Sequence, residues 1–311
     1  MTIEPDDIDA AAEVLARGGL VAFPTETVYG LGADATDVAA VGRIFDVKGR
    51  PRGHPLIVHL ADAAWLDDWA IDVPDRARAL VAAYWPGPLT LLVRRSERVS
   101  DAITGGRPTV GLRVPGHPVA LALLRRFGSG LAAPSANRFG RVSPTTAGHV
   151  RADLGADVDM ILDGGPCTVG VESTIVDVTA AVPTILRHGG VSAGAVAAVW
   201  GSDVAEVPTG PSRAPGMLES HYAPRAAVEL AGGTDDAARL AARHRDAGRA
   251  VDVLDPGVDA VAYARHLYEW LRDADARHLD VLVVVPPTDD GLGAAVNERL
   301  RKAAAPRHEP E

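Results

Sequence analysis

Residues 23–59 are the part of this sequence that most constrains how the chain can fold. A short apolar run at residues 20–23 predicts a strand, and Pro24 with the polar residues after it predicts that the strand ends in a turn. A loop punctuated by Gly30 and Gly32 is expected to follow. The polar residues of this stretch are therefore expected directly at a strand end.

A cationic motif, KGRPRGHP, comes after a segment near residues 37–45 whose apolar residues recur at helical spacing. Lys48, Arg50 and Arg52 alternate in this motif, and its two prolines predict an extended segment. Alternate side chains of an extended segment point the same way, so we expect the three cations to share a face that binds polyanionic oxygen. The alternative interpretation is a solvated run of charge, and these residues alone leave both open.

Lysine is rare in this chain. Of its 31 lysines and arginines, only Lys48 and Lys302 are lysines, and Lys302 is expected in a frayed C-terminal tail. Because the chain uses arginine elsewhere, lysine at position 48 indicates that a compact point charge is needed there instead of a planar guanidinium.

Length, composition and charge limit the class of protein. A chain of 311 residues with 47% hydrophobic content predicts two globular domains. A formal net charge of −10 argues against a protein that coats nucleic acid, so any contact with RNA should be local. The single cysteine, Cys167, excludes a disulfide framework and is expected to be a buried filler. The acidic N-terminus and the absence of any run of 18 apolar residues predict a soluble, cytoplasmic protein without a membrane segment.

The first two-thirds of the chain intersperse strands and helices without strict alternation, which predicts an α/β domain of the α+β type with a mixed sheet and helical cover. The predicted helices span residues 8–17, 37–45, 63–70, 74–84, 118–127, 145–154 and 192–200. The predicted strands span residues 20–23, 55–60, 89–94, 109–114, 131–133, 160–162, 173–178 and 184–187.

The rest of the chain predicts a linker and a second domain. Residues 202–224 are rich in proline, glycine and serine and read as a linker between a domain at 1–201 and a domain at 225–311. In the second domain, three short apolar strands are separated by helical patterns at residues 235–247 and 260–274. This alternation predicts a small, Rossmann-like parallel sheet.

Three groups of polar residues lie where predicted strands end. They are the pair Thr109 and Arg113, the pair Ser135 and Asn137, and residues 172–174 together with Arg187. Thr109 and Arg113 are four apart on one strand and so face the same side, where an arginine suits a carboxylate or a phosphate. The alternative for each group is turn chemistry or a cross-strand hydrogen bond, which is the commoner origin of such residues.

Taken together, the motifs resemble a known family. FPTETVYGLG, KGRP followed by PLIVH, TVGLRVP, APSAN, SPTTA, ESTIVD and ILRHGG, in this order, closely resemble the Sua5/YrdC/YciO family. The linker ending in SHYAP and the trailing α/β domain resemble the two-domain Sua5 branch. The resemblance is dense over residues 8–224, rests only on pattern in the second domain, and implies a YrdC-like fold for the first.

The resemblance implies L-threonylcarbamoyladenylate synthase activity. In this reaction ATP, L-threonine and bicarbonate or carbon dioxide give threonylcarbamoyl-AMP and pyrophosphate, the first step toward the threonylcarbamoyl modification of an adenosine in tRNAs. It also implies Mg²⁺ that enters with ATP and is held mainly through its phosphates. The expected partner is the downstream threonylcarbamoyl-transfer machinery that acts on tRNA.

The resemblance assigns site residues motif by motif. Residues that match the family's catalytic, nucleotide-handling set are Lys48, Arg50, Ser135 and Asn137. Residues that match further ATP contacts are Arg52, Thr109, Ser143, Arg187 and Tyr222. Residues that match its threonine pocket are Thr25, His59, Arg113, Ala133 and Ser173. Attack by a carbamate on an α-phosphate needs no protein nucleophile, so we expect catalysis by positioning and by neutralisation of charge on the phosphates.

The linker and two rival functions complete the sequence-based hypotheses. We hypothesise that residues 202–224 form a lid over the N-terminal cavity, with Tyr222 on the nucleotide and the C-terminal domain as anchor; the alternative is a mobile spacer. One rival function is an RNA-binding module of the same fold, which the net charge disfavours. The other is a sugar-phosphate enzyme of the riboflavin pathway, which needs paired acidic metal ligands where this chain offers only Glu26.

Overall fold

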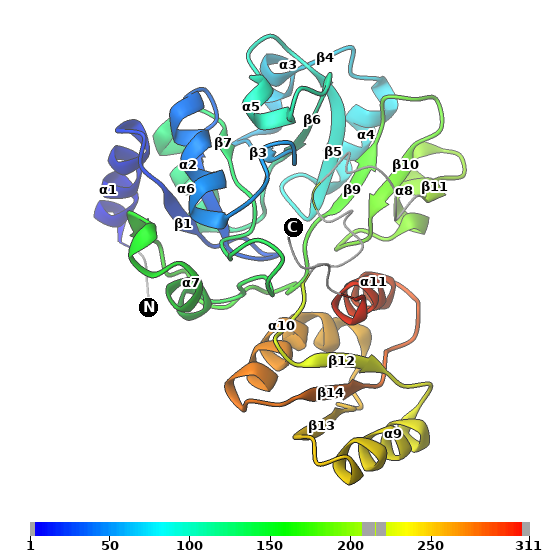
Figure 1. Cartoon of the computed structure of the whole chain (residues 1–311). Coiled ribbons are helices and arrows are strands. Elements are labelled where there is room, and N and C mark those ends of the chain that lie inside the picture. Colours follow the sequence, from blue (N-terminus) through cyan, green and yellow to red (C-terminus); the bar gives the residue numbers. More distant parts are fainter. Residues whose placement is uncertain (1–3, 207–214, 216–221, 307–311) are drawn as a thin grey trace.

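The structure is a computed structural model that describes residues 4–206, 215 and 222–306. Figure 1 shows an N-terminal domain, residues 4–206, above a smaller C-terminal domain, residues 225–306. Of the predicted linker and lid, residues 207–214 and 216–221 lie outside the described residues. The described part of that segment includes Tyr222 and Pro215, whose carbonyl accepts from Arg187 at 3.2 Å, and both residues line the cavity described below.

The N-terminal domain contains interspersed helices and strands, as predicted. Its helices are α1 (Pro5–Ala16), α2 (Val38–Lys48), η1 (Ala63–Trp65), α3 (Leu66–Trp69), α4 (Asp75–Tyr84), α5 (Asp101–Thr104), α6 (Pro118–Phe127), α7 (Ala147–Leu154), η2 (Gly155–Asp157) and α8 (Ala193–Trp200). Its strands are β1 (Val21–Phe23), β2 (Gly30–Asp34), β3 (Ile57–His59), β4 (Ala70–Ile71), β5 (Leu89–Arg95), β6 (Thr109–Arg113), β7 (Leu131–Ala132), β8 (Met160–Ile161), β9 (Thr174–Asp177), β10 (Thr184–Arg187) and β11 (Ala205–Glu206).

These strands form one mixed sheet in the order β11-β10-β9-β5-β6-β3-β7-β2-β1-β8, with β4 paired to β5. Parallel pairs such as β3 with β6 and β5 with β9 lie beside antiparallel pairs such as β5 with β6. Helix α1 packs against α6, and α4 packs against α8. The mixed sheet with helical cover is therefore confirmed. Because β11 pairs with β10, the sheet continues past residue 201, where the first domain was predicted to end.

The segment after the first turn differs from its prediction. Residues 30–34, predicted as a glycine-punctuated loop, form strand β2 and pair antiparallel with β1. Glycine is required at position 32 because an added Cβ would lie 2.8 Å from a ring carbon of Phe23. The glycines that suggested a loop thus mark a strand over which an aromatic ring packs closely.

The cationic motif also differs from its prediction. Helix α2 begins after Asp37, whose side chain accepts from the amides of Ala39 and Ala40, and continues to Lys48. Gly49 then ends the helix in the left-handed conformation at φ 63°. The proposed extended run with three cations on one face is therefore wrong, because the first cation belongs to the helix.

The C-terminal domain is a small parallel α/β unit, as predicted. Its strands are β12 (Ala227–Leu230), β13 (Val251–Leu254) and β14 (Val281–Val284), in the parallel order β12-β14-β13, and its helices are α9 (Thr234–Asp246), α10 (Ala260–Ala276) and α11 (Leu292–Ala304). The prediction missed α11 and placed Lys302 in a frayed tail. Lys302 instead lies buried on α11, where its ammonium donates to Glu298 at 2.5 Å.

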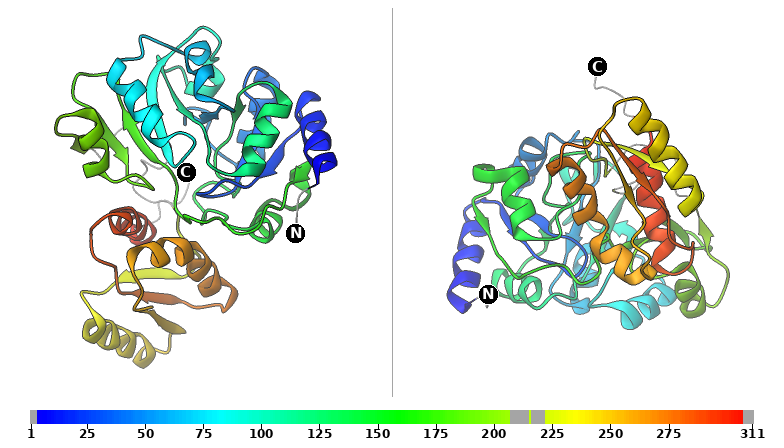
Figure 2. Two further views of the ribbon diagram at one scale, coloured as in Figure 1. Left: turned by 180° about the vertical axis from the view of Figure 1, so that it is seen from behind. Right: turned by 90° about the horizontal axis from the view of Figure 1, so that it is seen from below.

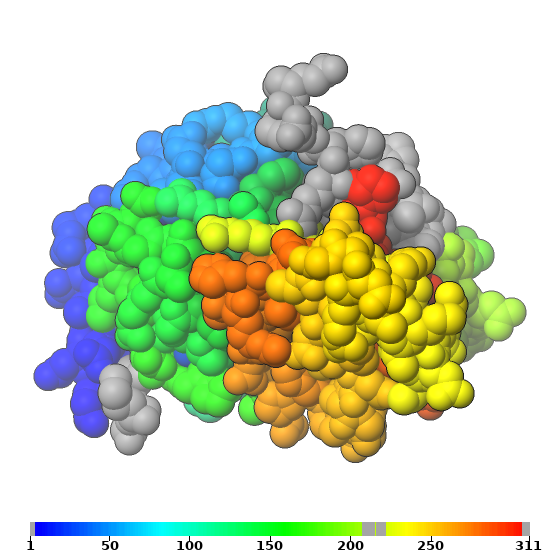
Figure 3. Space-filling model, turned by 60° about the horizontal axis from the view of Figure 1, so that its bottom comes forward, coloured from blue at the N-terminus to red at the C-terminus, as the bar shows by residue number. Residues whose placement is uncertain are grey.

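The two domains are in contact through helices α10 and α11. In Figures 1 and 2 these helices lie on the side of the C-terminal sheet that faces the N-terminal domain, and α9 lies on the far side. Figure 3 shows the yellow and orange C-terminal domain directly against the green segment of the N-terminal domain. The single cysteine, Cys167, is buried as predicted. Within the described ranges, no helix has the length and apolar character needed to cross a membrane.

Candidate active site

The candidate active site is a cavity of about 50 Å³ in the N-terminal domain. Its walls come from the loops after β1 and β7, from the ends of β3, β6 and β10, and from the segment before β9. The predicted residues that line it are Thr25, His59, Arg113, Ala133 and Ser173 of the threonine set and Arg50, Ser135, Arg187 and Tyr222 of the nucleotide set. The predicted residues outside its lining are Lys48, Arg52, Thr109, Asn137 and Ser143.

Arg113 is buried at the end of β6 and held from three directions. Its guanidinium donates to Glu26 Oε1 at 2.7 Å, to Thr27 Oγ1 at 3.0 Å and to the Gly87 carbonyl at 3.1 Å. The second oxygen of Glu26 accepts from the amide of Gly116 at 3.0 Å. These bonds fix the plane of the guanidinium, which is the preorganisation that bidentate recognition of a carboxylate requires.

Glu26 is a residue to which the sequence analysis assigned no role in this site. A buried arginine on an apolar strand needs a counter-charge, and that need was the signal that could have identified Glu26. The ion pair between Arg113 and Glu26 is almost fully buried, with side-chain exposures of 5% and 12%. Removing either partner would leave an uncompensated charge beside the cavity.

His59 lies next to Arg113 because β3 and β6 pair in parallel with these two residues in register. Burial, together with the charge of Arg113, lowers the pKa of His59 to about 3, so the imidazole is neutral at neutral pH. Among the described residues, its Nδ1 has no hydrogen-bond partner. A neutral, buried ring nitrogen without a partner at the cavity wall is suited to contact a polar group of a ligand.

Two further arginines, Arg50 and Arg187, line the same cavity. Arg50 donates to the Pro55 carbonyl at 3.0 Å and lies 5.4 Å from the ring centroid of Phe139. Burial and the charge of Arg187 together lower its pKa to about 10, against an opposing effect of Tyr222, so Arg50 remains a cation at neutral pH. Arg187 donates to the carbonyl of Ser173 at 2.9 and 3.0 Å. Two buried cations that repel each other across a cavity favour an anionic ligand between them.

Tyr222 closes one wall of the cavity from the C-terminal end of the predicted linker. Its backbone has a φ of 62°, an uncommon conformation for an aromatic residue. The ring stacks on Tyr268 of α10, with centroids 5.8 Å apart, and the guanidinium of Arg299 lies 5.3 Å from its centroid. The C-terminal domain therefore holds Tyr222 at the cavity.

Neither Lys48 nor Arg52 lines the cavity. The buried ammonium of Lys48 donates to the carbonyls of Ser135 at 2.6 Å and Asn137 at 2.5 Å, so it ties α2 to the loop after β7. Burial and the charge of Arg50 lower the pKa of Lys48. Arg52 is exposed and pairs with Asp46 at 2.7 Å. The predicted ATP contacts of Lys48 and Arg52 stay predictions. The predicted cationic face shared by these residues is wrong, because Lys48 is buried between backbone carbonyls and Arg52 forms an ion pair at the surface.

The remaining predicted residues lie behind or away from the cavity wall. Thr109 is at the opposite end of β6 from Arg113, so the two share a strand face but not the cavity. Asn137 donates from Nδ2 to two loop carbonyls, those of Arg138 and Arg141, at 2.8 Å each. Ser143 donates to Glu172 at 2.6 Å. Their assigned contacts with ATP stay predictions.

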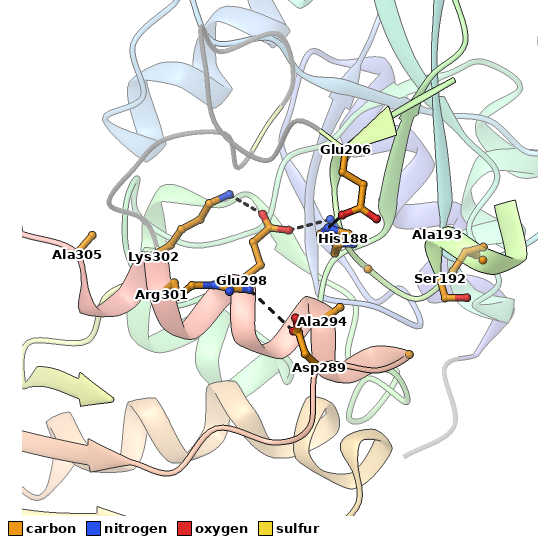
Figure 4. Close-up of a pocket in the computed structure, with 14 residues that line it drawn as sticks. His188, Ser192, Ala193, Glu206, Asp289, Ala294, Glu298, Arg301, Lys302 and Ala305 are labelled. Atoms are coloured by element: carbon orange, nitrogen blue, oxygen red, sulfur yellow. Dashed lines mark hydrogen bonds and ion pairs between the residues drawn. The ribbon is translucent and has the colours of Figure 1, made fainter. Parts of the chain in front are cut away.

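A larger cavity, of about 910 Å³, lies between the domains and is shown in Figure 4. Glu298 on α11 accepts there from Lys302 and, at 2.8 Å, from the backbone amide of His188. The predicted site residues do not line it, and these charged groups already pair with one another. The smaller cavity is therefore the candidate for the chemistry.

Comparison with known proteins identifies the family. The model for Sua5, YciO and YrdC proteins, described as telomere recombination, matches residues 13–189, and a model described as threonylcarbamoyl-AMP synthase, C-terminal domain, matches residues 186–305. The chain belongs to the Sua5/YciO/YrdC family. The second match confirms that it is of the two-domain Sua5 type.

Relatives from this family match this chain over both of its domains. The Pyrococcus abyssi protein named threonylcarbamoyl-AMP synthase is 42% identical, with 98% of this chain and 96% of the relative covered. The Bacillus subtilis protein of the same name is 39% identical, with coverages of 96% and 93%. The solved structure of P. abyssi Sua5 complexed with L-threonine has a TM-score of 0.93 at 40% identity, with coverages of 98% and 96%. The structure of Escherichia coli YciO has a TM-score of 0.53 at 26% identity, with coverages of 60% and 91%.

Proposed function

We propose that this chain is an L-threonylcarbamoyladenylate synthase, which converts ATP, L-threonine and bicarbonate or carbon dioxide into threonylcarbamoyl-AMP and pyrophosphate. One observation carries the proposal. A fixed arginine and a neutral histidine meet two further buried arginines at one cavity, in a chain related over both domains to proteins named threonylcarbamoyl-AMP synthase. Such a cavity suits an amino acid beside a polyphosphate.

The chemistry needs no nucleophile from the protein. The amino group of threonine and carbon dioxide form a carbamate with release of a proton, and a carbamate oxygen then attacks the α-phosphorus of ATP. The bond from that phosphorus to the bridging oxygen breaks, and its electron pair leaves with pyrophosphate. The protein contributes by holding the two reactants in line and by neutralising the charge that develops on the phosphates.

The residues of the cavity divide into a threonine set and a nucleotide set. Arg113, held in its plane by Glu26, binds the threonine carboxylate, and Nδ1 of His59 contacts the threonine hydroxyl. Arg50 and Arg187, which line the same cavity, bind the phosphates. A cavity of about 50 Å³ accommodates a few water molecules, so its walls must separate when a nucleotide enters.

Mg²⁺ would reach the site with ATP. Mg²⁺ is usually held by one or two carboxylates together with substrate phosphates. The two carboxylates closest to this site are already engaged, Glu26 by Arg113 and Glu172 by Arg299. Phosphate oxygens would therefore hold the ion, and its role is to shield the negative charge of the triphosphate.

The product is a reactive mixed anhydride, and its chemistry indicates where it goes. We propose that downstream threonylcarbamoyl-transfer machinery passes the group to an adenosine of tRNA in the cytoplasm. A formal net charge of −10 disfavours extensive binding of tRNA by this chain, so its contact with tRNA would be local.

Pyrophosphate release tests the proposed reaction. The full-length protein, incubated with Mg²⁺, should release pyrophosphate only when ATP, threonine and bicarbonate are all present. Each is omitted in turn, and threonylcarbamoyl-AMP is identified by mass spectrometry. Equal pyrophosphate release without threonine would refute the assignment.

Arg113→Ala tests which ligand this arginine holds. Loss of a charged partner costs roughly 2–5 kcal/mol, so the KM for threonine should rise by at least about thirtyfold while the KM for ATP changes little. The matched control is Arg94→Ala on the adjacent strand β5, where the side chain is exposed and pairs with Asp72. An effect mainly on the KM for ATP would mean that Arg113 binds the nucleotide instead.

A further inference from the structure

Glu172 is a buried carboxylate at the boundary between the two domains, and within the described residues it accepts hydrogen bonds from donors of both domains. One oxygen accepts from Ser143 at 2.6 Å, and the other accepts from the hydroxyl of Tyr268 at 2.7 Å and from Nε of Arg299 at 3.0 Å. Tyr268 belongs to α10 and Arg299 to α11, so both come from the C-terminal domain. Glu172 also lines the candidate active site.

Arg299 neutralises a negative charge that would otherwise face the nucleotide. Burial by itself raises the pKa of Glu172, but Arg299 and Arg187 outweigh burial, and the pKa falls to about 2. The carboxylate is therefore ionised at neutral pH. A carboxylate without this partner would repel phosphates in the cavity that it lines.

The same two C-terminal side chains also hold Tyr222. Tyr268 stacks on the ring of Tyr222 on one side, and Arg299 lies over that ring at 5.3 Å. Tyr268 and Arg299 therefore each contact both a carboxylate and an aromatic wall of the cavity. One structural unit of four side chains, the Glu172 cluster (Glu172, Tyr222, Tyr268 and Arg299), thus joins the domains.

A residue next to the Glu172 cluster also links the C-terminal domain to the candidate active site. Glu298, next to Arg299 on α11, accepts from the amide of His188, which follows Arg187 in the chain (Figure 4). Arg187 in turn donates to the carbonyl of Ser173, which follows Glu172. The backbone beside Arg187 of the nucleotide set is therefore held from the C-terminal domain, and Arg187 in turn contacts Ser173 of the threonine set.

We propose that Glu172 is a positioning residue for the nucleotide and that Tyr268 and Arg299 are the side chains through which the C-terminal domain takes part in the reaction. Glu172 orients Ser143, which matches an ATP contact, while Arg299 removes the repulsion between Glu172 and the triphosphate. The inference rests on the proposed synthase activity. It predicts a selective effect on ATP, since within the described residues the hydrogen bonds of the Glu172 carboxylate involve Ser143, Tyr268 and Arg299 and neither Arg113 nor His59.

A pair of tyrosines on α10 provides a matched test. Tyr268→Phe removes the hydroxyl that binds Glu172, whereas Tyr263→Phe removes the hydroxyl of another buried tyrosine, which binds the Val285 carbonyl within the C-terminal domain. In the full-length protein, Tyr268→Phe should raise the KM for ATP about tenfold, the effect expected for one hydrogen bond to a charged group. The KM for threonine should change less than about twofold, and Tyr263→Phe should leave both constants near wild type.

ATP binding is measured in parallel by the rise in unfolding temperature that ATP causes, which does not depend on catalysis. Tyr268→Phe should reduce this rise, and so should Glu172→Gln as a second variant, while the rise caused by threonine persists. Equal changes in both KM values, or identical behaviour of the two Tyr→Phe variants, would overturn the inference. If the wild-type protein binds ATP but releases no pyrophosphate, the proposed reaction is refuted. The comparison of ATP binding between the variants then still tests the role of Glu172.

Discussion

At the scale of single residues, buried charged side chains make contacts that stabilise this protein. Both of its lysines, Lys48 and Lys302, are buried. Lys48 satisfies two backbone carbonyls of the loop after β7, and Lys302 pairs with Glu298. Lysine is useful at such positions because a compact ammonium with three donors fits between several acceptors, where a planar guanidinium does not.

Lys48→Met is predicted to lower the free energy of unfolding by about 2–4 kcal/mol, because two buried carbonyls would lose their donor. Urea unfolding followed by circular dichroism measures the change. Arg52→Met is the matched control, since that side chain is exposed and its ion pair with Asp46 should contribute less than about 1 kcal/mol. If both variants unfold alike, Lys48 does not have the structural role assigned to it.

At the scale of elements, strand β2 shows how local composition can mislead. Its two glycines resemble loop punctuation, yet the strand pairs on both sides, with β1 and with β7. The ring of Phe23 occupies the place of a side chain at position 32. The packing of β1 on β2 therefore selects glycine, and the same strand then positions Gly30 at the cavity.

Gly32→Ala is predicted to destabilise the protein by about 1–3 kcal/mol, because the new methyl group would overlap the ring of Phe23. Gly53→Ala is the control, since an added Cβ there meets nothing within 4 Å. Urea midpoints of the two variants and the wild type make the comparison. A Gly32→Ala midpoint equal to that of Gly53→Ala would show that the ring moves aside at no cost.

At the scale of the whole molecule, the Glu172 cluster joins the two domains and makes the stability of the protein depend on pH in the acidic range. The pKa of Glu172 falls from 4.5, the ordinary value, to about 2, since Arg299 and Arg187 outweigh the effect of burial. A lowered carboxyl pKa means that the unfolded state binds more protons in this window. The stability that Glu172 contributes is thus present above about pH 4.5 and is lost as the pH falls toward 2.

We predict that the free energy of unfolding falls between pH 5 and pH 3 more steeply in the wild type than in Glu172→Gln, which cannot titrate at this position. Glu13→Gln should retain the wild-type slope, because Glu13 is exposed on α1. Urea unfolding across the pH range gives both slopes. Parallel curves for wild type and Glu172→Gln would show that Glu172 does not contribute to the acid sensitivity.

Much of the fold and part of the site could be predicted from local pattern. Helix α6 and strand β10 have the predicted bounds, since strong amphipathic or apolar runs are bounded there by proline and glycine. Nine residues that the family resemblance assigned, five to the threonine set and four to the nucleotide set, line one cavity. Helix α11 escaped prediction because its sequence is rich in alanine and charge, and its buried residues include the charged Glu298, Arg299 and Lys302.

The sequence by itself determined the family, the two-domain plan and most of the residues around the cavity, because ordered motifs and hydrophobic periodicity are local properties of the chain. Only the tertiary structure decided which charges meet. Glu26 pairs with Arg113 across 86 intervening residues, and Glu172 pairs with Arg299 across 126, as their sequence separations of 87 and 127 imply. Such pairs depend on strand register and domain packing, which bring together groups that no local pattern relates.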